Sequence, residues 1–303
     1  MASQPFTTPI LFLIFNRPDT TEKVFQRIHE LQPRYLYVSA DGPRAHKENE
    51  KELCESARKI IEKVDWDCEV KTHFSEINLG CKVGVSSGIN WFFEHVENGI
   101  ILEDDCLPDL SFFSFCEVML EKYKHDERIM HIGGTNFQDG IIRGSGSYYF
   151  SRITHVWGWA TWRRAWKKYD AAISSFSDIV NSNQFAGLFP NERVRKYWLK
   201  NFDLVHSNKK DTWDVQWMYT VSINHGLTIV PNNNLVSNIG FELDATHTFI
   251  QSDPAANRST ESLNRIIHPS VIALDAKADT YTFTKYLNPN KMRKLWRLLR
   301  HYI

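Results

Sequence analysis

The stretch Gly99-Ile-Ile-Leu-Glu-Asp-Asp-Cys-Leu-Pro-Asp109 places three apolar residues directly before three consecutive carboxylates, Glu103, Asp104 and Asp105. An apolar run of this length predicts a short buried strand, because it is too brief for a helix. The acids then follow the carboxyl end of that strand, which is the edge where open α/β sheets bind ligands. Hard divalent cations prefer such oxygen-rich sites and often share them with substrate phosphates. A solvated acidic turn is the alternative interpretation of the triplet taken alone.

The segments around this stretch alternate between strand and helix patterns. Strands are predicted at residues 10–15, 35–39, 68–74 and 129–132, and helices at 19–30, 46–64, 82–95 and 111–124. This alternation predicts an α/β fold with a Rossmann-like, mostly parallel sheet and helices on both faces. Polar residues follow the predicted strands at Arg17, Asp41, Asn78 with Lys82, and 103–105. Since parallel strands share one carboxyl edge, we expect these side chains to converge there.

The second half of the chain lacks the regular alternation of strand and helix patterns. A glycine-rich passage at 133–146 precedes a tryptophan cluster at 157–166, which shows no obvious strand pattern. Further helices are predicted at 191–206 and from Thr212 onward, and a strand at 227–230. No low-complexity linker separates the halves. We therefore predict one domain over 1–285, with a nucleotide-binding half at 8–135 and an acceptor half at 136–285, followed by a basic tail at 286–303.

The composition is that of an ordinary soluble globular protein. Hydrophobic residues make up 42% and charged residues 24% of the 303 residues. The 36 Lys and Arg balance 36 Asp and Glu, so no net field selects nucleic acid as a partner. Five cysteines lack metal-ligand spacing and show no disulfide framework, which favours a reducing compartment. With no signal-peptide pattern and no run near the roughly 20 apolar residues of a membrane span, we expect a cytoplasmic enzyme.

Three motifs, in order along the chain, resemble those of a nucleotide-sugar glycosyltransferase of the GT-A fold. They are Ile-Leu-Phe-Leu-Ile-Phe-Asn-Arg-Pro at 10–18, Glu-Asp-Asp at 103–105 and Trp-Asp-x-x-Trp at 213–217. Between residues 10 and about 247 the pattern is similar to the inverting N-acetylglucosaminyltransferase I type and related bacterial sugar transferases. The resemblance implies transfer of a hexosyl or N-acetylhexosaminyl group from a nucleoside-diphosphate sugar, with a UDP-sugar favoured. The acceptor is expected to be a hydroxyl of a glycan or lipid-linked glycan.

The resemblance also implies roles for individual residues. In that family the acidic triplet holds Mn²⁺ or Mg²⁺ on the diphosphate, which implies Asp105 as the metal ligand and Glu103 and Asp104 toward the nucleoside. Arg17 matches an arginine that contacts the nucleotide. Asp41 matches an aspartate that accepts a hydrogen bond from the base; a turn-forming Asp before Gly is the alternative.

Four more residues join these candidates. His247 resembles a late metal or phosphate ligand of several GT-A enzymes, although a lone histidine is more often structural. Lys82 lies at a predicted helix start, where cations are disfavoured, so we expect it to face phosphates; a solvated lysine is the alternative. Phe15 and Arg44 lie in the same strand-end segments and complete the predicted nucleotide-binding set.

An inverting transfer needs a base that takes the proton from the acceptor hydroxyl. Asp214 is the candidate, because a carboxylate beside indoles is partly desolvated and therefore more basic. A helix first-turn acid is the alternative, and Asp211 is the nearest substitute. Trp157, Trp159 and Trp213 are predicted to bind the acceptor by offering flat apolar faces to sugar rings, against the alternative of buried packing.

Residues 290–303 predict a basic amphipathic helix with Trp and Tyr on its apolar face. Such a helix suits an anionic membrane surface, which predicts peripheral attachment to the inner face of the cell membrane. A helix docked on the protein body is an equal alternative. Two other functions stay open. A sugar-nucleotide pyrophosphorylase would want a Gly-rich loop where this chain has Asn16-Arg17-Pro18, and a non-catalytic carbohydrate-binding protein would not need the acidic triplet.

Overall fold

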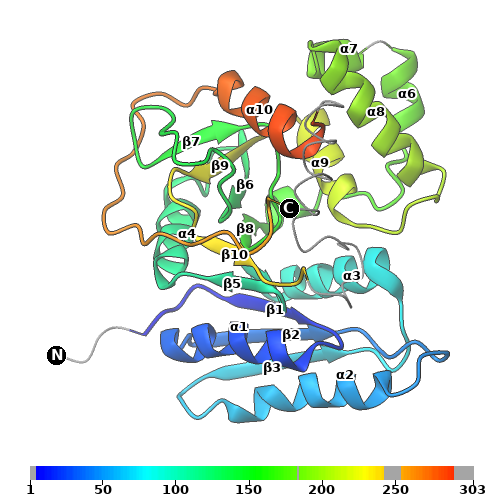
Figure 1. The fold of residues 1–303 in the computed structure, drawn as a ribbon, viewed down its shortest axis with the longest axis vertical. Helices are drawn as coiled ribbons and strands as arrows, with labels where there is room; N and C mark the ends of the chain where they lie inside the picture. Colours follow the sequence, from blue (N-terminus) through cyan, green and yellow to red (C-terminus); the bar gives the residue numbers. More distant parts are fainter. Residues whose placement is uncertain (1–4, 183, 242–253, 290–303) are drawn as a thin grey trace, which may run out of the picture.

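The computed structural model describes residues 5–182, 184–241 and 254–289, which form a layered α/β structure (Figure 1). The central sheet has the strand order β3-β2-β1-β4-β8-β6-β9-β7. Its strands are β1 Ile10–Ile14, β2 Tyr35–Ala40, β3 Glu69–Phe74, β4 Asn98–Glu103, β6 Ile129–Gly133, β7 Tyr148–Ser151, β8 Trp159–Trp162 and β9 Leu227–Pro231. A second, antiparallel sheet pairs β5 Cys106–Pro108 with β10 Val236–Asn238.

The sheet is mostly parallel. β1 pairs in parallel with both β2 and β4, β2 pairs in parallel with β3, and β6 pairs in parallel with β9. Only β8 and β7 run antiparallel to their neighbours. The predicted α/β fold, with a mostly parallel sheet and flanking helices, is therefore confirmed. Because β1 to β4 point the same way, the segments that follow them meet at one edge of the sheet.

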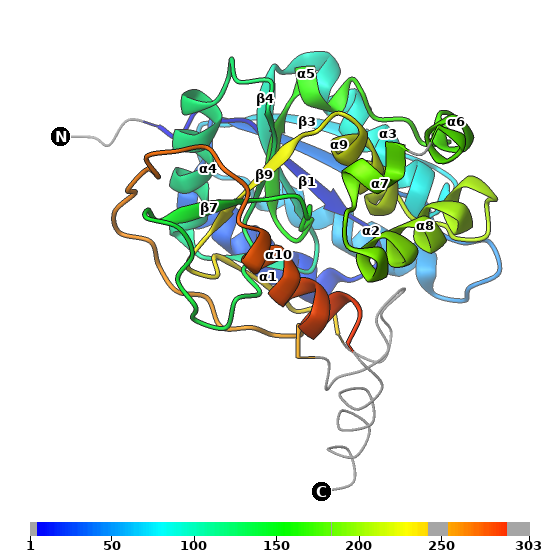
Figure 2. The ribbon, with the colours of Figure 1, turned by 90° about the horizontal axis from the view of Figure 1, so that it is seen from above.

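Successive residues of β1 point into two different helical layers, as the period of a strand requires. Ile10, Phe12 and Ile14 pack in one buried cluster with α1 and α4, whereas Leu11 and Leu13 pack in another with α3, α5 and α9. Figure 2 shows α1 and α3 on opposite sides of the strands. The helices of these layers are α1 Pro18–Leu31, α3 Gly80–His95, α4 Leu110–Lys122, α5 Arg163–Trp166 and α9 Asp214–Ile223.

The remaining helices lie outside the two main layers. In the first half, α2 Glu50–Lys59 continues into the short helix η1 Ile60–Lys63. In the second half, α6 Phe176–Asn181, α7 Gln184–Leu188 and α8 Glu192–His206 form a helical unit around a third aromatic cluster. This unit packs on α9, with the ring centroids of Phe202 and Tyr219 5.2 Å apart. The last described elements are α10 Ala276–Thr282 and η2 Phe283–Leu287.

The tryptophan cluster is the main difference from the predicted fold. Trp159–Trp162 form the buried strand β8, which lies between β4 and β6 in the sheet. The pattern gave no strand signal because both faces of β8 are buried, so apolar and polar residues do not alternate. Strands β5, β7 and β10 were also not predicted. The helix predicted at 46–64 begins only at Glu50.

The predicted nucleotide and acceptor halves share one sheet. β6 belongs to the first half, yet its neighbours β8 and β9 both come from the second. Tyr286 and Leu287 lie in η2 and belong to the body, not to a separate tail. The predicted helix at 290–303 lies outside the described residues. Within the described part of the chain, no helix has both the length and the apolarity needed to cross a bilayer.

Candidate functional site

Two neighbouring strand ends form the centre of the site. Glu103 is the last residue of β4, and Asp104 and Asp105 make the turn that follows. Arg17, after β1, donates from Nη2 to Asp104 Oδ1 at 2.5 Å and from Nη1 to Asp105 Oδ2 at 3.0 Å. The backbone N–H of Phe15 donates to Asp104 Oδ2 at 3.1 Å. Of the side chains predicted to converge at this sheet edge, Arg17 and the acids at 103–105 therefore lie together.

The acids in this cluster outnumber the cation. Asp104 is 3% exposed, and burial raises its pKa to about 6 even though Arg17 opposes the shift. Burial, and then the charges of Asp105 and Asp104, raise the pKa of the half-buried Glu103 well above its usual range. Burial works against the charge of Arg17, but the acids outweigh it and raise its pKa. Two of the three acids therefore hold a proton more readily than usual, and a bound cation would favour their charged forms.

Carboxylates are the ligand type that a hard divalent cation prefers, and at this cluster other oxygens would have to complete its coordination. Among the described residues, no group of three or more His, Cys, Asp or Glu forms a complete metal-binding set. Glu103 accepts no side-chain hydrogen bond from the described residues, and Asp105 is engaged mainly by Arg17. Water and phosphate oxygens commonly fill the remaining positions around Mg²⁺. His247, the other predicted ligand, lies outside the described residues.

The segment after β10 closes over Asp105, which the sequence analysis missed. The N–H of Ile239 donates to the backbone oxygen of Asp105 at 2.8 Å. A Cβ on Gly240 would lie 2.2 Å from Asp105 Oδ2 and 2.6 Å from Arg17 Nη1. Glycine is therefore required here for close approach of the backbone. A glycine shortly after a strand is too common a pattern to have predicted this contact.

Asp41 holds the start of α3. Its carboxylate accepts N–H groups from Gly42 at 2.8 Å, Leu79 at 2.9 Å and Gly80 at 3.1 Å, and the Asn78 amide at 3.0 Å. Burial raises its pKa, although these hydrogen bonds oppose the shift. A carboxylate has about four lone-pair positions, and here each has a donor. The structure therefore favours a structural role over the predicted hydrogen bond to a base.

Arg44 also has a structural partner. It forms an ion pair with Glu50, with Nε 3.0 Å from Oε1, and its guanidinium lies 5.6 Å from the centroid of the Phe15 ring. Glu50 is 3% exposed and also accepts the Asn16 amide at 2.9 Å. Glu50, which the sequence analysis did not select, thus ties Arg44 to the turn after β1. Phe15 and Arg44 thus lie together beside this turn, and their contact with a nucleotide stays a prediction.

The loop at 207–213 is attached to the first turn of α3. Asp211 accepts the N–H groups of Cys81 and Lys82, both at 3.0 Å. Lys82 Nζ donates to Asn208 Oδ1 at 2.9 Å, so this ammonium is directed to the loop and not to an open phosphate position. The substitute base considered from the sequence, Asp211, therefore acts here as a helix cap that joins two distant segments.

Asp214 lies at the start of α9. It is half-buried, and Thr212 Oγ1 donates to its carboxylate. Its charge is among the causes, after burial and the other two acids, that raise the pKa of Glu103. Burial, then Glu103 and Asp214, raise the pKa of the Cys81 thiol well above its usual range. Asp214 is therefore within electrostatic range of the acids from β4.

Two of the three predicted acceptor-binding tryptophans are in the core. Trp159 is 0% and Trp213 3% exposed, and their rings stack with centroids 5.5 Å apart. Neither ring presents a free face, which corrects the prediction that they contact sugar rings. Their neighbours in the same buried cluster are Trp166 and Trp217. Trp157 is half-buried and packs edge-on against Phe241, so it alone of the three remains a candidate.

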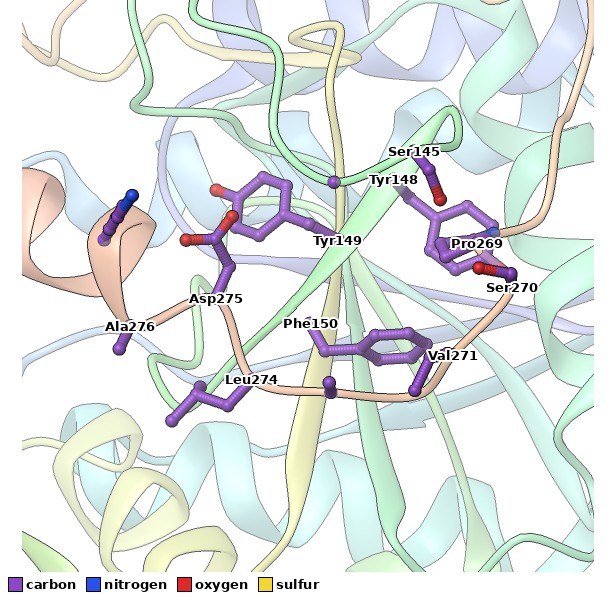
Figure 3. A pocket seen from close by; sticks show the side chains of 13 residues that line it. Ser145, Tyr148, Tyr149, Phe150, Pro269, Ser270, Val271, Leu274, Asp275 and Ala276 are labelled. Atoms are coloured by element: carbon purple, nitrogen blue, oxygen red, sulfur yellow. The ribbon is translucent and has the colours of Figure 1, made fainter.

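A separate cavity of about 410 Å³ lies between β7 and the segment at 269–277 (Figure 3). Tyr149 and Phe150 form its floor, and Asp275 and Val271 lie along the opposite segment. None of the predicted site residues lines it. The cavity is therefore unrelated to the carboxyl edge of β1 and β4.

No family model and no curated protein sequence matches the chain. Among solved structures, HddC from Yersinia pseudotuberculosis has 9% identity and a TM-score of 0.32, covering 52% of this chain and 77% of its own. The 4-diphosphocytidyl-2C-methyl-D-erythritol synthase from Anaerococcus prevotii has 10% identity and a TM-score of 0.33, covering 54% and 76%. A UDP-glucose pyrophosphorylase complexed with UDP-glucose has 10% identity and a TM-score of 0.38, covering 74% and 90%. The functional assignment therefore rests on the geometry of the site.

Proposed function

We propose that the protein is a metal-dependent glycosyltransferase that moves a sugar from a nucleoside-diphosphate sugar, UDP-linked by preference, to a glycan hydroxyl with inversion. One observation carries the proposal. Arg17 from the end of β1 bridges Asp104 and Asp105 at the end of β4, with Glu103 as a third acidic side chain beside them. The motif resemblance at 10–18, 103–105 and 213–217 supports the same assignment.

In this proposal the donor diphosphate lies at the shared edge of β1 and β4. Asp105 and Glu103 would hold Mn²⁺ or Mg²⁺, and the ion would supply positive charge for the departing nucleoside diphosphate. Arg17 adds a second positive charge at the same position. Asp104 fixes that guanidinium, and its other oxygen accepts the Phe15 N–H, so it orients Arg17 instead of contacting the donor directly.

Asp214 is proposed as the base. Its carboxylate takes the proton of the acceptor hydroxyl as the oxygen attacks the anomeric carbon, and the bond to the diphosphate breaks on the opposite face. Thr212 holds one carboxylate oxygen, which leaves the other for the acceptor. The capping of α3 by Asp211 keeps the loop before Asp214 close to the donor half.

Calorimetric binding of UDP, GDP, CDP and dTDP, with and without Mn²⁺, tests the donor site. We expect one nucleotide to bind in a metal-dependent manner, and Asp105→Ala to abolish that binding. Glu121→Ala, which removes an exposed acid on α4, is the matched control and should bind as the parent does. Metal-dependent binding that persists in Asp105→Ala would contradict the metal assignment.

Product analysis with UDP-sugars separates the proposed function from the pyrophosphorylase alternative. A glycosyltransferase releases UDP and lengthens the acceptor, whereas a pyrophosphorylase forms UTP only when pyrophosphate is supplied. Asp214→Asn should keep donor binding and lower transfer about 10²- to 10⁴-fold. Asp178→Asn on α6 is the control for removal of an exposed acid. Unchanged transfer in Asp214→Asn would remove it as the base.

A further inference from the structure

A second hollow, of about 710 Å³, lies along α8 and reaches the end of η2. We call it the α8 groove. Its helical wall has side chains three or four positions apart, which places them on one face of α8. Residues from η2 and just after it close the other side. The residues used below are Arg193, Lys196, Tyr197, Lys200, Leu287 and Asn288.

The α8 groove carries a net positive charge. Its charged lining consists of Arg193, Lys196 and Lys200 against the single acid Glu192. Glu192 pairs with Lys196 at 2.6 Å, one helical turn away. Arg193 donates to the backbone oxygen of Asn288 and keeps its full charge, since a carbonyl does not neutralise it. Lys200 is exposed and has no ion-pair partner among the described residues. Two positive charges thus remain uncompensated.

The groove lies close to the proposed base. Tyr197 lines the groove from α8, and α8 packs directly on α9, the helix that begins at Asp214. Burial, and then the Asp214 charge, raise the pKa of Tyr197, so the two groups are within electrostatic range. Leu287 supplies an apolar contact on the opposite wall. The groove therefore lies on the helix that packs against α9, which carries Asp214 at its start.

We propose that the α8 groove binds the acceptor through an anionic group, a carboxylate or a phosphate, placed beside the hydroxyl that is glycosylated. This inference rests on the proposed glycosyltransferase function and specifies its acceptor class. Lys200 and Arg193 supply the charge, and Tyr197 and Leu287 supply ring and apolar contacts for the adjoining sugar or linker. The chain's own residues 290–303 contain five Lys and Arg and no acid, so they do not provide the complementary charge.

Binding of three probes to the full chain, followed by tryptophan fluorescence, tests this inference. The probes are a hyaluronan hexasaccharide with carboxylates, a glycerol phosphate oligomer with phosphodiesters, and the neutral chitohexaose. We expect at least one anionic probe to bind about tenfold more tightly than chitohexaose, with salt weakening only the anionic probes. The anionic probe that binds more tightly identifies the carboxylate or the phosphate as the source of charge.

Charge reversal at Lys200 tests whether the anionic probes bind in the α8 groove. Lys200→Glu should weaken anionic-probe binding about tenfold, and Lys200→Gln should have a smaller effect. Lys59→Glu makes the same change at an exposed position on α2, in the other half of the molecule (Figure 1), and should leave binding unchanged. Equal effects of Lys200→Glu and Lys59→Glu, or anionic probes that bind no better than chitohexaose, would overturn the inference.

Calorimetry with UDP and Mn²⁺ on the same proteins separates this inference from the proposed function. If UDP binds in the parent but the anionic probes do not, the groove inference fails and the glycosyltransferase proposal stands. If the parent protein binds no nucleotide with metal present, the proposed function fails as well. Normal UDP binding in Lys200→Glu also shows that this variant is folded.

Discussion

Substitution of Gly240 by alanine tests the packing that closes over Asp105. The new Cβ would lie 2.2 Å from Asp105 Oδ2 and 2.6 Å from Arg17 Nη1, well inside the spacing of about 3.5 Å at which nonbonded atoms rest. Backbone residue 240 or the Arg17–Asp105 ion pair must therefore shift. Overpacking of this kind costs about 1–3 kcal/mol. We expect Gly240→Ala to lower the free energy of unfolding by that amount and to weaken metal-dependent nucleotide binding.

Gly187→Ala is the matched control, because a Cβ at Gly187 in α7 meets nothing within 4 Å. There the same substitution should stabilise the protein by about 0.5–1 kcal/mol, since alanine favours helix more than glycine does. Urea unfolding and nucleotide calorimetry on both variants provide the comparison. Equal stability and nucleotide affinity in Gly240→Ala and the parent would refute the close approach of residue 240 to Asp105.

Three further perturbations act elsewhere. Asp211→Ala leaves two N–H groups of α3 without their acceptor. We expect the free energy of unfolding in urea to fall by about 1 kcal/mol, and sugar transfer to slow at unchanged UDP affinity. Unchanged transfer would show that this cap does not help to position Asp214. Burial raises the pKa of Asp279 to about 6, so its contribution to stability is complete below about pH 4 and falls by about 3 kcal/mol as the pH rises through 6. Between pH 4 and 8, the urea midpoint should fall less in Asp279→Asn than in the parent protein. The same pH dependence in both proteins would contradict the prediction. Removal of residues 290–303 should reduce sedimentation with anionic liposomes, and unchanged sedimentation would favour a helix docked on the body.

Local patterns predicted the donor side of the fold well. The apolar runs of β1 and β4 are uninterrupted and followed by polar or charged residues, so their type and their shared edge followed from sequence alone. The placement of Arg17 beside Asp104 and Asp105 followed from parallel pairing, because two adjacent strands bring their ends together whatever their separation in the chain.

The predictions that failed depend on partners that are distant in sequence. The sequence around Asp41 predicts a carboxylate that is available to a ligand. In the structure, however, its oxygens accept the backbone N–H groups of Gly42 and Gly80. The ring of Trp159 is of the kind that stacks on sugars, yet Trp213, the residue before α9, covers it. In both cases a local pattern gives the chemistry of the side chain, but tertiary contacts decide whether that chemistry is free to act.

Strand β8 has a consequence for how the chain is synthesised. β4 and β6 emerge from the ribosome early, but the strand that pairs with both, Trp159–Trp162, follows later, and β9 later still. Until then the acidic strand has one unpaired edge, and such edges are templates for association with other chains. A nascent chain stalled before residue 159 should therefore be prone to aggregation. The sheet of the first half can be completed only after much of the second half has been synthesised.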